Sequence, residues 1–106
     1  MAAQSITSEN FDSVVSGSDV PVLVDFWAAW CGPCRALGPV VEEVAEELSG
    51  RLAVYKCNVD EEPELASSFH IVSIPTLIVF KGGRAVHSMV GSMPKAALLK
   101  ELEGVL

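Results

Sequence analysis

Two neighbouring stretches of the chain carry the clearest hydrophobic patterns. Residues 20–28 (VPVLVDFWA) are apolar almost throughout and rich in valine. Such a run is typical of a strand buried on both faces, as at the centre of a parallel sheet. Residues 34–48 instead predict an amphipathic helix, because their apolar side chains recur at helical spacing and glutamates fill the other face. The apolar positions of this helix are Leu37, Val40, Val41, Val44, Ala45 and Leu48.

The rest of the chain predicts shorter elements that alternate in type. Strands are expected at 4–6, 52–59, 76–81 and 84–90, and helices at 8–16, at 60–69 and from 93 onward. Ser8 and Asp60 are expected to cap their helices. Because a helix connects the strands at 20–28 and 52–59, those two strands should be parallel. The order β-α-β-α-β-α-β-β-α predicts an α/β fold of three layers, with a central mixed sheet and helices on both faces.

Composition narrows the class of protein. With 106 residues, half of them hydrophobic, residues 1–106 should form a single domain with its own core. Three cysteines, an odd number, argue against a secreted disulfide framework. The sequence shows neither a signal peptide nor an apolar run of the ~20 residues that a membrane span needs, so we expect a cytoplasmic protein. A net charge of −7 argues against nucleic acid and anionic membranes as partners.

Cys31 and Cys34 lie three positions apart, between the buried strand and the amphipathic helix. This spacing brings two sulfurs close enough for a disulfide that opens and closes without refolding, and a C-x-x-C near a βαβ pattern is typical of a redox site. A structural disulfide and half of a zinc site are the alternatives. A zinc site needs about four ligands. The remaining candidates, Cys57, His70 and His87, show no ligand spacing, so we expect no metal.

Each cysteine has an expected role that follows from its position. The unpaired N–H groups and the positive dipole end of the helix favour a thiolate at Cys31, which is nearer the turn and is the expected nucleophile. Cys34, one turn into the helix, is the expected resolving thiol. Gly32 and Pro33 add no cation that would stabilise the thiolate further, so the pair should act as a reductant and not as an oxidant. Cys57, which lies between Lys56 and Asn58 in a strand with apolar positions on either side of them, is expected to be an inert core thiol.

The motifs occur together in an order that resembles the thioredoxin family. The segment Trp30-Cys31-Gly32-Pro33-Cys34 follows a strand that ends in VDFWA, and Ile74-Pro75-Thr76 and Val90-Gly91 come downstream. The resemblance covers nearly the whole chain. It implies the thioredoxin fold and a general protein-disulfide reductase, which passes electrons from a thioredoxin reductase to the disulfides of diverse target proteins. It also implies a monomer without a bound cofactor, in which Cys31–Cys34 is the redox-active disulfide.

The same resemblance assigns roles around the cysteine pair. Asp25 is the odd residue in its apolar strand, and burial should raise its pKa. In the family the matching aspartate lies beneath the second cysteine and moves protons, and Lys56 matches the lysine near it. Pro75 matches a cis-proline that faces the disulfide. The rim around the disulfide should bind extended substrates through apolar surface and backbone groups, and it comprises Trp30, Gly32, Pro33, Val72, Ser73, Ile74, Pro75 and Gly91.

Two other functions fit the same motifs. A disulfide oxidase or isomerase would use the same cysteines, but the Gly32-Pro33 pair opposes it. A non-catalytic binding subunit would use the same apolar face and would keep its role without the cysteines. The sequence leaves open which reductase serves the chain, whether its electrons come from nicotinamide or ferredoxin, and which proteins are its targets. It also leaves open the value of the reduction potential and any regulatory role of Cys57.

Overall fold

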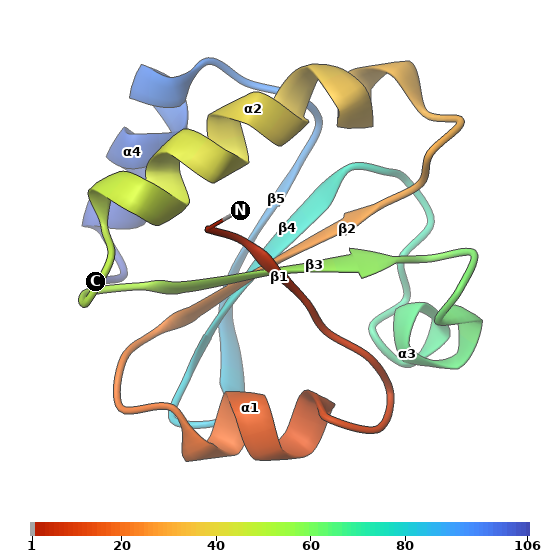
Figure 1. Ribbon diagram of the computed structural model, residues 1–106, viewed down its shortest axis with the longest axis horizontal. Coiled ribbons are helices and arrows are strands. Elements are labelled where there is room, and N and C mark those ends of the chain that lie inside the picture. The colour runs from red at the N-terminus through yellow and green to blue at the C-terminus, as the bar shows by residue number, and fades with distance from the viewer. Residues whose placement is uncertain (1) are drawn as a thin grey trace.

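The computed structural model, which describes residues 2–106, is built around a five-stranded sheet (Figure 1). The strands are β1 (Gln4–Ser5), β2 (Val22–Trp27), β3 (Ala53–Asn58), β4 (Thr76–Lys81) and β5 (Arg84–Val90). The helices are α1 (Phe11–Gly17), α2 (Gly32–Glu47), α3 (Pro63–Ser68) and α4 (Lys95–Glu103). The predicted order of elements is confirmed. Within the described residues, none of the helices has the length and apolar character that crossing a membrane requires.

The sheet is mixed, and β2 lies at its centre. The strand order is β1-β3-β2-β4-β5, in which β1, β3 and β2 run parallel to one another while β4 is antiparallel to both β2 and β5. All five residues from Val22 to Phe26 are buried, as the apolar run predicts. The carboxyl end of this buried strand leads directly to the cysteine pair at the start of α2.

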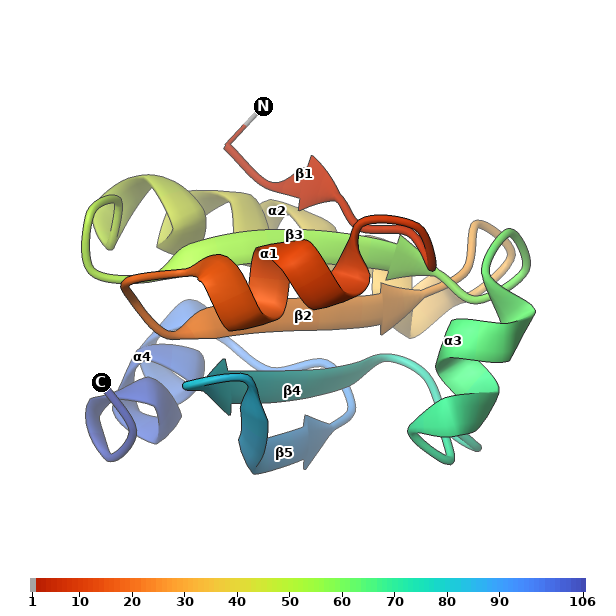
Figure 2. The same cartoon turned by 90° about the horizontal axis from the view of Figure 1, so that it is seen from below.

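Helices cover both faces of the sheet, which confirms the three layers. Helices α2 and α4 lie on one face, and α1 and α3 lie on the other (Figures 1 and 2). The core on the α2 side contains Leu23, Leu37, Val41, Val44, Leu77, Val79, Leu98 and Leu102. On the other face, four phenylalanine rings pack together, with 5.2 to 6.1 Å between the centroids of the rings in contact. They belong to Phe11, Phe26, Phe69 and Phe80. Close packing on both faces therefore fixes the position of β2 and of the helix that follows it.

The start of α1 differs from the prediction. The helix begins at Phe11, and Ser8 is not its cap. The amide of Thr7 donates to the side chain of Asn10 at 2.8 Å, and the amide of Ser8 donates to Glu62 at 2.8 Å. The segment before α1 is thus held by a local turn and by a contact with a distant part of the chain. The sequence around the helix start does not indicate the distant contact.

The chain leaves α3 through a Schellman motif that has histidine where glycine is usual. The amide of His70 donates to the carbonyl of Ser67 at 3.0 Å, and the amide of Ile71 donates to the carbonyl of Ala66 at 3.1 Å. His70 has a φ of 55°, in the left-handed region that glycine enters without a steric cost. This turn directs residues 71–75 back to the sheet, where β4 begins.

Substituting His70→Gly should stabilise the fold. Removal of the Cβ relieves the left-handed strain, and the entropy of glycine offsets part of the gain, so we expect about 0.5–1 kcal/mol. Gly50, with a φ of 89°, is the matched control, since Gly50→Ala should destabilise by about 1 kcal/mol. Denaturant unfolding of both variants measures the two changes, and a loss of stability in His70→Gly would contradict the strain.

Candidate active site

Cys31 and Cys34 form a disulfide at the amino end of α2. Cys31 is the N-cap of the helix, where an oxygen-bearing side chain is usual, and its sulfur accepts the amide of Cys34 at 3.2 Å. Gly32 and Pro33 form the first two helical positions, and proline fits there because the amide it lacks would have no helical partner. A hydrogen bond and the helix dipole thus favour negative charge on the Cys31 sulfur.

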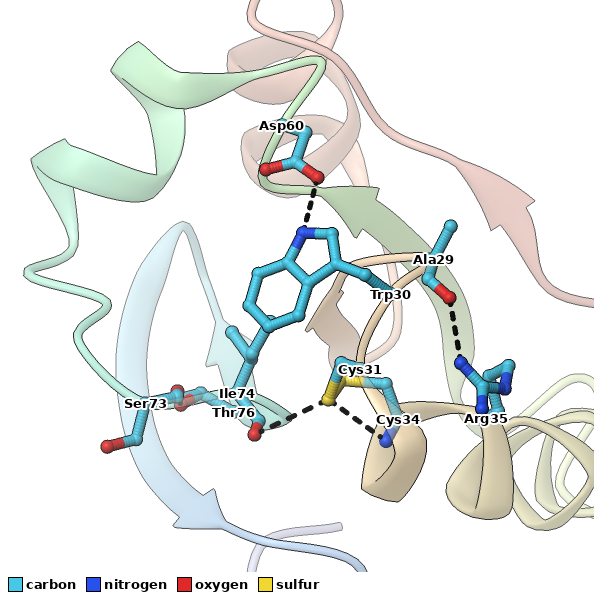
Figure 3. The surroundings of a disulfide bond; sticks show 9 residues. All are labelled: Ala29, Trp30, Cys31, Cys34, Arg35, Asp60, Ser73, Ile74 and Thr76. Atoms are coloured by element: carbon cyan, nitrogen blue, oxygen red, sulfur yellow. Dashed lines mark hydrogen bonds between the residues drawn. A yellow bond between two sulfur atoms is a disulfide. The ribbon is translucent and has the colours of Figure 1, made fainter.

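Both cysteines are buried. The exposed fraction is 5% for Cys31 and 2% for Cys34. They pack with buried Ala28 and half-buried Ile74, and the Cys31 sulfur lies 3.7 Å from the carbonyl oxygen of Ile74 (Figure 3). Cys31 is therefore recessed, and only a group that lies directly against this surface can reach its sulfur.

Trp30 lies beside the disulfide and is held by Asp60, for which the sequence predicts a different role, that of a helix cap. Its side chain is 69% exposed, yet its indole N–H donates to the carboxylate of Asp60 at 2.8 Å (Figure 3). The amides of Asp60 and Glu61 in turn donate to the side chain of Asn58. This turn replaces the predicted helix start, and α3 begins only at Pro63. An asparagine directly after a strand signals the turn, but no local pattern signals the bond to Trp30.

The loop before β4 and the end of β5 meet next to the disulfide. The Ile74–Pro75 peptide bond is cis, as the resemblance predicts. The amide of Gly91, whose φ of 98° suits glycine, donates to the carbonyl of Pro75 at 2.9 Å. Ile74 is thereby placed against Cys31, and Gly91 is tied to the same loop.

Two of the predicted substrate-binding residues lie farther from the sulfurs. The Ser73 side chain points away from the disulfide in Figure 3, and its carbonyl accepts the hydroxyl of Thr76. Val72 is almost fully exposed and is not part of the cluster around the cysteines. A contact of these two residues with substrate stays a prediction.

Asp25 is fully buried at the centre of β2, in register with Lys56 on β3 and Leu77 on β4. Neither of its carboxylate oxygens has a hydrogen-bond partner within the described residues. Burial raises its pKa from 3.8 to about 6, and the positive charge of Lys56 opposes part of this rise. The predicted direction is confirmed. A buried carboxyl that titrates near neutral pH is suited to exchanging protons with a thiol.

Lys56 acts on Asp25 through its charge and not through a hydrogen bond. Its ammonium group lies over the ring of Trp27, 4.6 Å from the ring centroid. This cation–π contact holds the positive charge of Lys56 over Trp27, the last residue of β2. The ammonium group therefore does not form a direct ion pair with the Asp25 carboxylate.

Cys57 is buried among the side chains on the α1 side of the sheet, separate from the active-site pair. The pKa of the Cys57 thiol is raised to about 12, chiefly by burial and further by the negative charges of Glu62 and Asp25. Within residues 2–106, no three His, Cys, Asp or Glu side chains are grouped so that they could hold a metal ion.

The substitution Asp25→Asn should stabilise the protein at pH 7 by about 1–3 kcal/mol. Because the pKa is raised in the folded state, the stability tied to the protonated carboxyl is complete below pH 3.8 and is lost as the pH rises through about 6. The advantage of the variant should therefore appear across that window and vanish below about pH 4. Denaturant unfolding as a function of pH tests this, with exposed Asp12→Asn as the control.

The same Asp25→Asn variant should reduce protein disulfides about 10- to 100-fold more slowly at pH 7, because it removes the proton acceptor that the resemblance predicts for Cys34. Asp12→Asn should keep the normal rate. A variant that is less stable than the original protein and equally fast would show that Asp25 is an ordinary structural aspartate.

Cys57 should resist alkylation in the folded, reduced protein. Iodoacetamide attacks thiolates, and burial with a pKa of about 12 leaves Cys57 with almost none near neutral pH. Cys31 should label at least about 100-fold faster than Cys57. Mass spectrometry of timed samples measures both rates, and comparable labelling of the two thiols would contradict the core assignment.

Comparison with known proteins identifies the family. The thioredoxin family model matches residues 2–104. Thioredoxin 1 of Nostoc sp. is 53% identical over 102 residues, which are 96% of this chain and 95% of that protein. The thioredoxin of Alicyclobacillus acidocaldarius is 54% identical over 105 residues, or 99% of each chain. A bifunctional thioredoxin reductase/thioredoxin of Mycobacterium leprae is 50% identical over 101 residues, 95% of this chain and 22% of that protein. With its fold and its Cys31–Cys34 disulfide, the chain belongs to the thioredoxin family of thiol–disulfide oxidoreductases.

Proposed function

We propose that the chain is a general protein-disulfide reductase that cycles between a Cys31/Cys34 dithiol and the disulfide. The observation that carries the proposal is the Cys31 sulfur at the N-cap of α2, where it accepts the amide of Cys34. The arrangement stabilises charge on one sulfur and places the second thiol one helical turn away. Nucleophilic attack and resolution both need these features.

The first step transfers a substrate sulfur to the protein. The Cys31 thiolate attacks one sulfur of the substrate disulfide, so a Cys31–S bond forms and the substrate S–S bond breaks. The second substrate sulfur leaves as a thiolate and takes a proton from solvent. Trp30, Ile74 and Gly91 form the surface against which the substrate segment lies, with the Trp30 ring fixed by Asp60.

The second step releases the reduced substrate. Cys34 gives its proton to Asp25, and its thiolate attacks the Cys31 sulfur. The Cys31–Cys34 bond forms, the mixed disulfide breaks, and the substrate sulfur leaves as a thiolate that is then protonated. Two electrons have passed from the dithiol to the substrate. The raised pKa of Asp25 makes the carboxylate a proton acceptor of suitable strength near neutral pH.

The direction of the reaction follows from the weak stabilisation of the thiolate. A strong oxidant needs a highly stabilised dithiol form. In this chain Gly32 and Pro33 bring no charge, and the guanidinium of neighbouring Arg35 donates to the carbonyl of Ala29 at 3.1 Å (Figure 3). The helix end is then the main source of stabilisation, which favours the disulfide and hence reduction of the substrate.

A thioredoxin reductase is the proposed source of electrons. The M. leprae relative joins a thioredoxin reductase and a thioredoxin by name, which supports such a partner for this chain. The proposed cycle uses the Cys31–Cys34 disulfide and needs no bound cofactor. The diverse protein targets, the monomeric state and the cytoplasmic location stay predictions, as do the roles of Val72 and Ser73 in substrate binding.

Insulin reduction tests the proposed function. Protein reduced with dithiothreitol and freed of it should reduce one insulin disulfide for each Cys31–Cys34 pair that becomes oxidised. Cys31→Ser should abolish the reaction, and Cys34→Ser should accumulate a mixed disulfide with insulin. Reduced protein that leaves insulin intact, while its oxidised form readily oxidises a dithiol peptide, would instead make it an oxidase.

A further inference from the structure

A small hollow lies on the sheet face that carries α1 and α3, beside the active-site loop. Its volume is about 200 Å³. Its apolar wall is formed by Phe69 and Ile71 of the loop after α3, by Ile78 of β4 and by Val90 of β5. Small-molecule sites usually occupy about 300–1,000 Å³. The hollow therefore has the size for one apolar side chain and not for a metabolite.

The hollow is bordered by apolar side chains that the fold leaves in water. Within the described residues, the exposed large hydrophobic side chains are Trp30, Val72, Val86 and Val90. Val72, at 94% exposed, and Val90, at 65%, both line the hollow. A single exposed valine needs no explanation, but two at the edges of one apolar depression form a patch of the kind that marks an interaction site.

The hollow borders the surface for which we propose substrate binding. Val72 lies two residues before Ile74, whose carbonyl oxygen is 3.7 Å from the Cys31 sulfur. Val90 directly precedes Gly91, whose amide donates to the carbonyl of Pro75. In register, Val90 pairs with Thr76, the first residue of β4. The two segments that frame the disulfide thus also frame the hollow.

We propose that the hollow is a specificity subsite, which takes an apolar side chain located two or three residues from the reacting cysteine of an extended substrate. The inference rests on the proposed reductase function. A substrate strand beside residues 72–74 advances about 3.3 Å per residue, as the protein chain does. A substrate residue two positions from the one beside Ile74 therefore lies beside Val72, at the edge of the hollow.

The lining also determines which side chains the hollow rejects. Apart from His70, the residues that line it carry no ionisable side chain. The other polar side chains of the lining carry hydroxyl groups, and the hydroxyl of Thr76 already donates to the carbonyl of Ser73. A carboxylate or an ammonium would lose its hydration there without gaining an opposite charge, while leucine or valine would bury apolar area. The subsite should thus favour aliphatic residues over serine and aspartate.

Peptide disulfides test the subsite. Nine-residue peptides of serine and alanine, each with a central cysteine and oxidised to a disulfide-linked dimer, would carry Leu, Ser or Asp at position −3, −2, +2 or +3. The second-order rate constant for reduction by the reduced protein is measured by acid quench and chromatography. On one side of the cysteine, Leu should raise this rate constant about tenfold over Ser.

Two variants of β5 test whether the preference for Leu over Ser peptides arises in the hollow. Ser88→Phe fills the hollow from its β5 wall and should reduce the Leu-to-Ser ratio to within about twofold of unity. Val86→Phe, on the same strand but outside the lining, is the control and should keep the full ratio. A ratio that Ser88→Phe leaves intact would overturn the inference.

A trapped complex gives a reading that does not depend on Ser88→Phe folding well. In Cys34→Ser the peptide stays attached to Cys31, and the Leu peptide should shift the methyl resonances of Ile78 and Val90 more than the Ser peptide does.

Equal shifts, or a Leu-to-Ser ratio below twofold at all four positions while Ser peptides are still reduced, would overturn the subsite and leave the reductase function intact. Failure to reduce any peptide or insulin would overturn both.

Discussion

The site depends on one hydrogen bond, from the amide of Cys34 to the sulfur of Cys31 at the start of α2. It exists because a helix begins with amides that lack helical partners, and because the buried strand β2 ends four residues before Cys31. The cores on the two faces of the sheet hold that strand and that helix in fixed positions. Charge on the Cys31 sulfur is therefore stabilised by the same packing that stabilises the fold.

Asp25 shows the opposite relation between stability and function. Its carboxyl lies in the most buried strand, without a hydrogen-bond partner among the described residues, in a place where leucine or valine would pack well. Lys56 offsets only part of the cost of burying its charge. Ionisation of this buried carboxyl costs stability at neutral pH, and the same raised pKa is what suits Asp25 to the proposed role of proton acceptor.

Some features follow from the sequence because their causes are local. The apolar run around β2, the helical period of α2 and the spacing of Cys31 and Cys34 each determine what the structure shows. The cis bond before Pro75 does not follow from local preference, since trans is favoured for most X-Pro bonds, and its prediction needed the family resemblance.

Other features depend on partners that are far apart in the sequence. Ser8 and Asp60 look like helix caps, but neither caps a helix. The Ser8 amide donates to Glu62, 54 positions away, and the Asp60 carboxylate accepts the indole N–H of Trp30, 30 positions away. The hollow between Phe69 and Val90 likewise exists only when the loop after α3 lies beside β5. Composition and periodicity contain no information on such contacts, so these features needed the structure.

Equilibration with glutathione tests most directly the claim that a Cys31 thiolate stabilised mainly by the helix end belongs to a reducing dithiol. The protein is mixed with known ratios of reduced and oxidised glutathione, and the fraction with a Cys31–Cys34 disulfide is measured after acid trapping. The dithiol should reduce oxidised glutathione almost completely, which means a potential more negative than that of the glutathione couple. If reduced glutathione instead opened the disulfide quantitatively, as for strong oxidants near about −120 mV, the claim would be contradicted.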